Sequence, residues 1–396
     1  MAALDTVSLE SIVARDVDYL TAIRHDLHAH PELGYQEVRT SGVVQRELAA
    51  IGVDFVAGLA GGTGVAAYLP ATHEPGSAST VALRADMDAL PIEEATGKPY
   101  TSTHPGTMHA CGHDGHTTVL LGVARALNQI ERPNNVVLVF QPAEEGGAGG
   151  RKMCEDGVLE GRVIGRPVDR IFGLHGFPGL HVGQVATVDG PMMAATDSLY
   201  ITVRGKGGHA AMPHTGVDPI VIASHIITAS QSIVSRNVNP LDSMVITFAM
   251  INGGTAHNII PDEVKIVGTV RTLSPDARRL AEKRLGEICH GIAHAMGGTA
   301  DYMYEHGYPV TVNDVEAADL FRRVNGEDLQ PDTTPVMGGE DFSFYGQHVP
   351  ACFFWLGLVS HGEQGYPNLH APNFDFNDQA IAPGVRAMCR LATAVV

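Results

Sequence analysis

The stretch of residues 109–130 constrains this chain most, because it crowds possible metal ligands immediately before a helix. Its first eight residues read His-Ala-Cys-Gly-His-Asp-Gly-His, and Cys111 and His113 stand two positions apart. In an extended segment two such side chains leave on the same side, so both can reach one ion. A Cys-x-His pair also occurs where the residues only fill a turn or a core, and a metal site therefore needs further ligands.

The helix behind this cluster is predicted from apolar residues that recur at helical spacing between residues 119 and 130. Asp114 or Thr117 is placed to cap its first turn. The positive N-terminal end of the helix would then point at the cluster and favour the thiolate form of Cys111, which is the form that binds metal ions.

Three predicted strands are expected to bring polar side chains from other parts of the chain to this cluster. The runs 80–84, 135–140 and 170–174 read as strands, and open α/β sheets gather their sites at the carboxyl ends of such strands. The side chains placed there are Asp86, Asp88, Glu144, Glu145 and His175. Glu144 and Glu145 could be a solvated charge pair, but they follow a buried strand and precede a glycine-rich loop with no side chains to crowd a ligand. We therefore favour a functional role for them.

The pattern of expected elements changes near residue 195. Segments 198–204, 218–236, 244–251, 263–271, 275–296 and 300–305 read in turn as strand, helix, strand, strand, helix and strand. This β-α-β-β-α-β order is the ferredoxin-like arrangement. We expect an α/β metal-binding domain with a central, mostly parallel sheet, formed by residues 1–194 and 306–396, and a ferredoxin-like α+β lid domain at 195–305.

The amino-acid composition disfavours some kinds of binding partner. A formal net charge of −18 disfavours nucleic acid and anionic membranes as partners. Apolar runs are too short for a membrane span, and the start lacks the basic and apolar regions of a signal peptide. Five scattered cysteines argue against a disulfide framework and for a reducing compartment, so a cytoplasmic location is expected.

A nucleotide-dependent ligase or transferase is the alternative from another enzyme class. The glycine-rich turn that begins at Gly61 superficially resembles a phosphate-binding loop. It lacks the Lys-Ser/Thr ending of such a loop and any helix behind it, and the chain carries no dinucleotide-binding fingerprint. The turn is therefore interpreted as structural.

Eight short motifs occur along the chain in one order. They are His28-Ala-His-Pro-Glu-Leu-Gly, Arg84-Ala-Asp-Met-Asp-Ala-Leu-Pro, His109-Ala-Cys-Gly-His-Asp, Gln141-Pro-Ala-Glu-Glu, Gly173-Leu-His-Gly, Gly207-Gly-His-Ala, Gly253-Gly-Thr-Ala-His-Asn and Leu369-His-Ala-Pro. In this order they resemble the dinuclear metallopeptidase family of aminoacylases, carboxypeptidases and dipeptidases, and most closely its hippurate hydrolase and indole-3-acetyl-amino-acid hydrolase branch. The resemblance implies a metal-dependent amidohydrolase that cleaves the amide bond of N-acyl amino acids.

The resemblance also implies a ligand set. The residues that it assigns to two divalent ions per subunit are Cys111, His113, Glu145, His175 and His370, with Cys111 placed to bridge them. Zinc, manganese, nickel and cobalt all suit a set that includes a thiolate. Where carboxypeptidases of the family carry His-x-Asp, this chain carries Asp86-Met-Asp88, so these aspartates are expected to orient ligands rather than bind an ion.

The remaining roles follow from the ligand set. Glu144, the neighbour of a ligand, is the expected general base, and His209 is the expected donor to the oxyanion of the tetrahedral intermediate. In relatives that histidine reaches the partner subunit's site, which implies a homodimer formed through the lid domain. Asn258 and Arg271 could hold the free carboxylate of the substrate.

Two further readings stay within the family. A dipeptidase or carboxypeptidase is the alternative activity, with a dipeptide as substrate. A catalytically inactive metal-binding relative would be expected to have lost Glu144, which this chain retains. Met337–Phe342 predicts a tight turn near the site, and no chemistry is assigned there to Glu340 or Asp341.

Overall fold

The computed structural model describes residues 6–395 and divides them into two compact units. The first unit comprises the described residues up to Gly190, residues 312–334 and the chain from residue 341 onward. The second comprises residues 191–311 and 335–340. The limits expected for the lid domain, 195 and 305, fall inside the second unit, and they stay a prediction of where an independently folding domain begins and ends.

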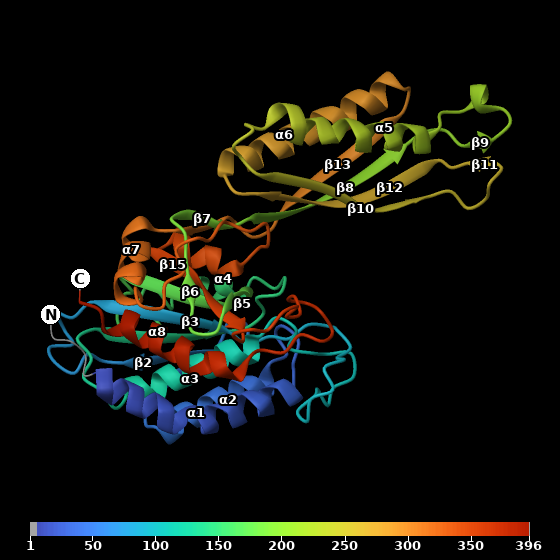
Figure 1. The fold of residues 1–396 in the computed structure, drawn as a ribbon. Coiled ribbons are helices and arrows are strands. Elements are labelled where there is room, and N and C mark those ends of the chain that lie inside the picture. The colour runs from blue at the N-terminus through green and yellow to red at the C-terminus, as the bar shows by residue number, and fades with distance from the viewer. Residues whose placement is uncertain (1–5, 396) are drawn as a thin grey trace. The chain divides into compact units, whose positions relative to one another are not determined.

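A seven-stranded sheet forms the centre of the first unit, in the order β1-β2-β4-β3-β5-β15-β6 (Figure 1). Its strands are β1 (Asp54–Leu59), β2 (Gly64–Leu69), β3 (Thr80–Asp86), β4 (Asn135–Gln141), β5 (Arg170–His181), β6 (Val185–Ala186) and β15 (Ala351–Val359). The four middle strands β4, β3, β5 and β15 run parallel, and the outer strands pair antiparallel. The predicted α/β class with a mostly parallel central sheet is confirmed.

Helices of the first unit pack on this sheet. They are α1 (Thr6–Ala29), α2 (Val38–Ala50), α3 (His113–Leu127), α4 (Gly149–Asp156), α7 (Val315–Val324) and α8 (Ile381–Thr393), with short helical turns at Asp341–Gln347 and Asp378–Ala380. α1, α3 and α8 pack together, and Gly122 of α3 lies so close to the neighbouring helices that a Cβ there would approach Val385 to 2.6 Å and Leu20 to 2.8 Å. Among the helices of residues 6–395, none is both long and apolar enough to cross a membrane.

Of the three strands β3, β4 and β5, two end close to the residues at which the sequence predicts their ends, and the third is longer than predicted. β3 ends at Asp86 and β4 at Gln141, but β5 continues to His181 because it goes on pairing with β15. His175 therefore lies within a strand rather than after one. Since pairing of β5 with β3 stops at Gly173, His175 still stands beyond the last strand pair on that side.

The second unit contains a four-stranded antiparallel sheet in the order β10-β12-β8-β13. Its strands are β8 (Ala195–Arg204), β10 (Met244–Gly253), β12 (Glu263–Thr272) and β13 (Thr299–His306), and its helices are α5 (Pro219–Ser232) and α6 (Pro275–Ala295). Figure 1 shows both helices on one face of this sheet, where they bury its core. The predicted β-α-β-β-α-β order is confirmed.

Several short elements complete the chain. They are β7 (Gly190–Met193), β9 (Gly208–His209), β11 (Ile259–Ile260) and β14 (Thr311–Asn313), with a 3-10 turn at Pro213–Thr215 and a π-helical turn at Ile233–Asn237. β9 and β11 pair with each other, and Figure 1 places them at the same end of the second unit. Two-residue strands of this kind carry no periodic sequence pattern, and the sequence did not predict them.

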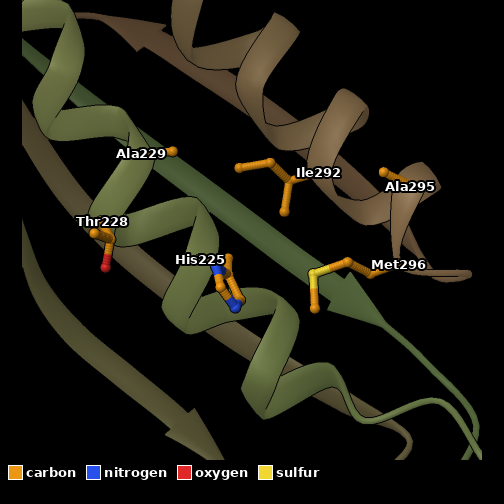
Figure 2. A pocket seen from close by; sticks show the side chains of 6 residues that line it. All are labelled: His225, Thr228, Ala229, Ile292, Ala295 and Met296. Carbon is orange, nitrogen blue, oxygen red and sulfur yellow. The ribbon is translucent and has the colours of Figure 1, made fainter.

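A cavity of about 300 Å³ opens between α5 and α6 (Figure 2). Its lining residues are His225, Thr228, Ala229, Ile292, Ala295 and Met296. One imidazole is the single strong metal donor in this lining, which has no carboxylate or thiol. The cavity therefore does not offer the donor set that a divalent ion needs.

Candidate active site

All five side chains that the resemblance assigns to metal ions lie in the first unit and form two groups of donors. The donor atoms of Cys111, His113 and His175 lie within 4.8 Å of one another, and so do those of Cys111, Glu145 and His370. Cys111 Sγ lies 3.3 Å from His175 Nε2, and Glu145 Oε1 lies 3.1 Å from His370 Nε2. Because Cys111 belongs to both groups, the arrangement can hold two ions side by side.

The turn before α3 brings Cys111 and His113 to the same place. Gly112 precedes the helix with φ 87°, a left-handed conformation that glycine adopts without a steric penalty. A Cβ at Gly112 would also approach Phe376 to 3.1 Å. The close packing of the aromatic ring against this turn therefore requires glycine.

The loop that carries His370 is joined to the Cys111 loop through the backbone. The His370 N–H donates to the carbonyl oxygen of Ala110 at 2.8 Å. His370 has φ 63°, which is uncommon for a residue with a side chain and is found most often at sites where the surroundings enforce it. The unusual backbone aims the imidazole at Glu145 rather than away from the cluster.

Asp88 accepts hydrogen bonds from two residues of these donor groups. Its Oδ1 accepts from His113 Nδ1 at 3.2 Å, and its Oδ2 accepts the backbone N–H of Glu145 at 2.9 Å. Asp86 instead accepts from His116 Nδ1 at 2.7 Å, while His116 Nε2 accepts the Gly176 N–H at 2.8 Å. Both nitrogens of His116 are thus occupied, so it is a poor ligand although it lies next to the cluster.

Buried donor atoms without partners test whether the residues fit metal ions. His113 Nε2 and Glu145 Oε1 have no hydrogen-bond partner among residues 6–395. His370 Nε2 lies near Glu145 Oε1, but the two atoms do not meet hydrogen-bond geometry. Leaving such an atom unsatisfied costs about 1–3 kcal/mol. Two orphaned donors beside a thiol and two more imidazoles fit a pair of divalent ions.

The ionisation of Cys111 differs from the sequence expectation. Burial, followed by the carboxylates of Glu145 and Glu144, raises the pKa of the Cys111 thiol well above its usual value. The expectation that the helix N-terminus favours the thiolate is wrong for the protein without a cation, because the carboxylates that oppose it come from a distant part of the chain. A bound cation must therefore displace the thiol proton, and metal affinity should rise with pH.

The cap expected at the start of α3 is also absent. Neither Asp114 nor Thr117 caps the helix, which begins after Gly112 without a side-chain cap. Asp114 Oδ2 accepts from Arg24 Nε and from His28 Nδ1, both at 2.8 Å. Asp114 therefore serves tertiary packing, and the first turn is positioned from α1 instead.

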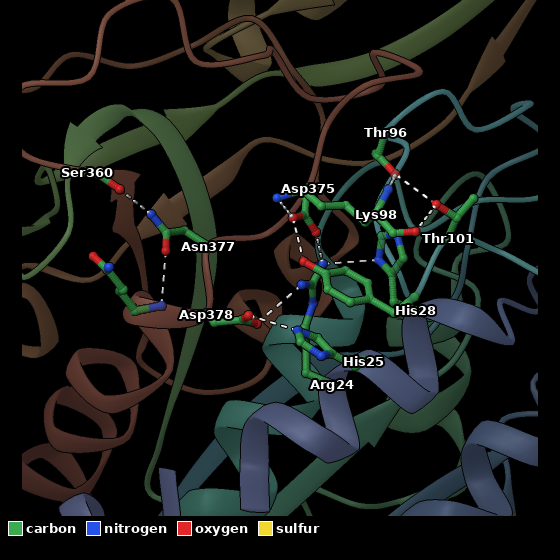
Figure 3. A network of polar contacts seen from close by, with 12 residues as sticks. Arg24, His25, His28, Thr96, Lys98, Thr101, Ser360, Asp375, Asn377 and Asp378 are labelled. Atoms are coloured by element: carbon green, nitrogen blue, oxygen red, sulfur yellow. Dashed lines mark hydrogen bonds and ion pairs between the residues drawn. The ribbon is translucent and has the colours of Figure 1, made fainter. Parts of the chain in front are cut away.

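The fully buried Arg24 joins α1 to the segment that follows His370 (Figure 3). Its guanidinium donates to Asp375 and to Asp378, the latter at 3.2 Å. His28 lies beside it and pairs with Glu94 at 3.2 Å. Together with the Arg24–Asp114 ion pair, this network connects the segments that follow Cys111 and His370 to one helix.

The charge of His28 should make stability depend on pH. Burial lowers the pKa of His28, but Asp114 and Glu94 outweigh it and raise the pKa from 6.5 to about 9. The folded state binds this proton more tightly, so its contribution is complete below about pH 6.5 and is lost as the pH rises through about 9. At about 1.4 kcal/mol per pKa unit, the contribution is at most about 3.5 kcal/mol.

We expect His28→Gln to lower the thermal unfolding midpoint at pH 6 and to have little effect above about pH 9.5. Glutamine keeps a hydrogen-bonding side chain but does not titrate in this range. Unfolding midpoints of the variant and the unsubstituted protein, measured across pH in the same metal-loaded state, check this. A difference that stays constant over that range would rule out the charge of His28 as its cause.

Glu144 lies against the same cluster. It is 6% exposed, and its donor atom lies within 4.8 Å of those of His113 and Glu145. Its Oε1 accepts the backbone N–H of Asp341 at 3.3 Å. A carboxylate in this position can reach a water held between the two donor groups.

The other sequence-predicted residues lie in the second unit. His209 in β9 is exposed, and the neighbouring Ala210 N–H donates to the Asn258 carbonyl oxygen at 3.1 Å, so these two residues are close. Arg271 stands near the far end of β12, eight residues from Glu263 at its start, which is roughly 26 Å along a strand. Within one chain the structure does not bring Arg271 to Asn258.

Sequence reasoning missed the residues that connect the site to the fold. Arg84 and Gln141 stand inside the motifs given above but received no role, and Asp341 was left without chemistry. All three are fully buried and hydrogen-bonded to one another. A fully buried arginine needs carboxylate partners, and the arginine in an otherwise apolar strand was the signal available in the sequence.

Comparison with known proteins adds independent information. Residues 82–394 match the model of the peptidase family M20/M25/M40. IAA-amino acid hydrolase ILR1-like 4 of Arabidopsis thaliana is 42% identical over 386 residues, covering 95% of this chain and 85% of its own length. N-acetyl-L-cysteine deacetylase of Bacillus subtilis (strain 168) is 43% identical over 366 residues, covering 91% and 84%.

A solved structure is similar over almost the whole chain. The Bacillus subtilis YXEP protein, described as a dinuclear metal-binding peptidase from the M20 family, superposes with a TM-score of 0.83. Its sequence is 33% identical, and the match covers 96% of this chain and 98% of that one.

Proposed function

This chain belongs to the peptidase family M20/M25/M40 and is a hydrolase of amide bonds, and from this premise we propose that it cleaves N-acyl amino acids into a carboxylic acid and a free amino acid. One observation supports the proposal most: a buried donor group and a second, more exposed one share Cys111 and adjoin a buried carboxylate, Glu144. By name, the similar proteins act on an IAA-amino acid and on N-acetyl-L-cysteine, both of which are N-acyl amino acids.

The proposed cofactor is a pair of divalent ions per subunit. Cys111, His113 and His175 would hold one ion, and Cys111, Glu145 and His370 the other. Zinc, manganese, nickel and cobalt suit these ligands. When bound, such a pair lowers the pKa of a water held between the ions and polarises the scissile carbonyl.

Glu144 is the proposed general base. Its carboxylate accepts the proton of the attacking water and then delivers it to the amine nitrogen as the C–N bond breaks. The Asp341 N–H donates to Oε1 of this carboxylate, whose donor atom lies within 4.8 Å of those of His113 and Glu145. The leaving amine departs neutral, and the second proton of the water stays on the newly formed carboxylic acid until that acid ionises in solvent.

The second unit supplies the remaining groups in this proposal. His209 would donate to the oxyanion, and Asn258 and Arg271 would bind the free carboxylate of the substrate. Because Arg271 and Asn258 lie far apart within a chain, one carboxylate can meet both if they come from different subunits. This supports a homodimer through the lid domain, in which the partner contributes His209 and Asn258.

The location of the protein is part of the proposal. All five cysteines are free thiols buried in the described structure. Unpaired thiols persist in a reducing compartment, which supports the cytoplasm.

A substrate panel tests the proposed function. N-acetyl, benzoyl and indole-acetyl amino acids should be hydrolysed by metal-reconstituted protein, and the matching N-acyl amino acid amides, which lack the carboxylate, should react poorly. Turnover of dipeptides alone would indicate the dipeptidase or carboxypeptidase alternative. Turnover of no member of the panel by metal-loaded protein would refute the proposal.

Replacing the shared ligand should weaken both ion sites. We expect Cys111→Ser to lower metal affinity by at least about tenfold and the bound stoichiometry below two, because an unactivated hydroxyl is a poorer ligand than a thiolate. Titration of metal-free protein with zinc against a competing chelator measures this. Cys352→Ser is the matched control, because Cys352 is equally buried but lies outside the cluster. Unchanged zinc affinity in Cys111→Ser would exclude Cys111 as a ligand.

A further inference from the structure

A buried arginine lies behind the candidate site and connects the ends of β3 and β4 to the helical turn that begins at Asp341. Arg84 donates from Nη1 to Asp86 Oδ2 at 2.7 Å, from Nη2 to Asp341 Oδ1 at 2.8 Å and from Nε to Gln141 Oε1 at 2.8 Å. The side chains of Arg84, Asp86 and Asp341 are fully buried. Desolvated ion pairs of this kind hold their geometry rigidly, because breaking one leaves an uncompensated charge.

Asp341 is fixed from several directions. Both its carboxylate oxygens accept from Gln141 Nε2 at 2.9 Å, and Oδ2 also accepts the Gly150 N–H at 2.8 Å. A Cβ at Gly150 would lie 2.8 Å from the Asp341 carbonyl oxygen, so the close approach depends on glycine. The backbone of Asp341 is consequently held in one place relative to the end of β4.

The fixed backbone of Asp341 points a donor at Glu144. Its N–H donates to Glu144 Oε1 at 3.3 Å. A glutamate side chain has three rotatable torsions, and a rigid donor at one carboxylate oxygen restricts the rotamers that the carboxylate can adopt beside the donor groups. Misplacing a reacting group by about 1 Å can cost roughly 100-fold in rate, so this contact can matter for catalysis.

We propose that Asp341, held by Arg84 and Gln141, is a positioning residue that orients the Glu144 carboxylate for proton transfer. This rests on the proposed function, in which Glu144 is the general base. It gives a role to the Gly-Gly-Glu-Asp segment, whose acidic residues had none from the sequence. Asp341 acts through Glu144 and does not itself touch the substrate.

The variant Asp341→Asn tests this. Asparagine keeps the shape but removes the charge that pairs with Arg84 and places a donor where an acceptor is needed. We expect kcat for an N-acyl amino acid to fall by about tenfold or more, KM to stay within about twofold and two bound metal ions to remain. Asp16→Asn is the matched control, because Asp16 is a buried carboxylate paired with Arg15 and Arg125 at the other end of α3, and its kcat should not change.

A double-mutant cycle with Glu144→Gln separates positioning from general destabilisation. If Asp341 acts through Glu144, adding Asp341→Asn to Glu144→Gln should lower kcat by less than about twofold further. Losses that multiply in the double variant, a fall in bound metal, or an unchanged kcat in Asp341→Asn would each overturn the inference. If Glu144→Gln alone leaves kcat unchanged, the proposed function fails instead.

A second variant covers the case in which Asp341→Asn does not fold. Gln141→Met removes the hydrogen bonds that the Gln141 side-chain amide donates to Asp341, but it leaves the Arg84–Asp341 ion pair. We expect a smaller fall in kcat, of about threefold to tenfold, that likewise disappears in the Glu144→Gln background. A fall of equal size in both backgrounds would overturn the inference.

Discussion

Glu144→Gln is expected to lower the turnover of an N-acyl amino acid by about 10²- to 10⁴-fold while the bound metal stays constant. Glutamine keeps the size of the side chain and can still accept the Asp341 N–H, but it cannot take a proton from water. General base catalysis is typically worth a factor of this order. Steady-state hydrolysis and metal content, measured on the same preparation, check the prediction.

Glu145→Gln is the matched comparison for this prediction. Glu145 belongs to a donor group with Cys111 and His370, so in the proposed mechanism its charge neutralises an ion and does not move a proton. Metal occupancy and rate should fall together in this variant. If instead Glu144→Gln loses metal and Glu145→Gln keeps it, the two roles are the reverse of those proposed. If neither variant changes the rate, the proposed hydrolytic mechanism is wrong.

Removal of the metal ions should abolish amide hydrolysis and leave the protein folded. The donor residues stand mostly on loops at one end of the sheet, whereas β3, β4 and β15 are buried along their whole length without any contribution from an ion. Metal binding then adds stability by mass action on a fold that exists without it. Dialysis against a chelator, followed by far-ultraviolet circular dichroism, thermal unfolding and an activity assay, measures both effects.

The control for chelation is restoration of the rate by added metal. Hydrolysis that persists at full rate in metal-free protein would contradict the proposed chemistry. Complete unfolding on chelation would contradict only the statement that the sheet is stable alone, because the donor loops would then be needed for folding. The two outcomes are distinguished by the spectrum of the metal-free protein.

Much of the fold could be predicted because its elements carry strong local patterns. β4 is a continuous apolar run between Asn135 and Gln141, and β8 alternates buried residues with more exposed ones along its length. The end of β5 could not be predicted, since its extension to His181 depends on pairing with β15, which is distant in sequence. The two-residue strands β9 and β11 exist only through each other.

Some residues of the candidate site could likewise be predicted from the sequence, and others could not. Cys111, His113 and Glu145 stand in local motifs, and the structure brings them together as the resemblance implies. The high pKa of Cys111 was not predictable, because the burial that mainly causes it and the glutamates that add to it arise only in the folded chain. The Arg84–Asp341 ion pair joins residues 257 positions apart, and no single stretch of sequence indicates such a partner.

Stepwise reconstitution tests the central claim most directly. Metal-free protein is titrated with manganese or zinc while bound metal and hydrolysis of an N-acyl amino acid are followed together. We predict that the rate rises to a plateau when two ions are bound per subunit and that Glu144→Gln binds the same two ions without reaching it. A plateau at one ion, or two bound ions with no hydrolysis of any N-acyl amino acid in the panel, would contradict the account.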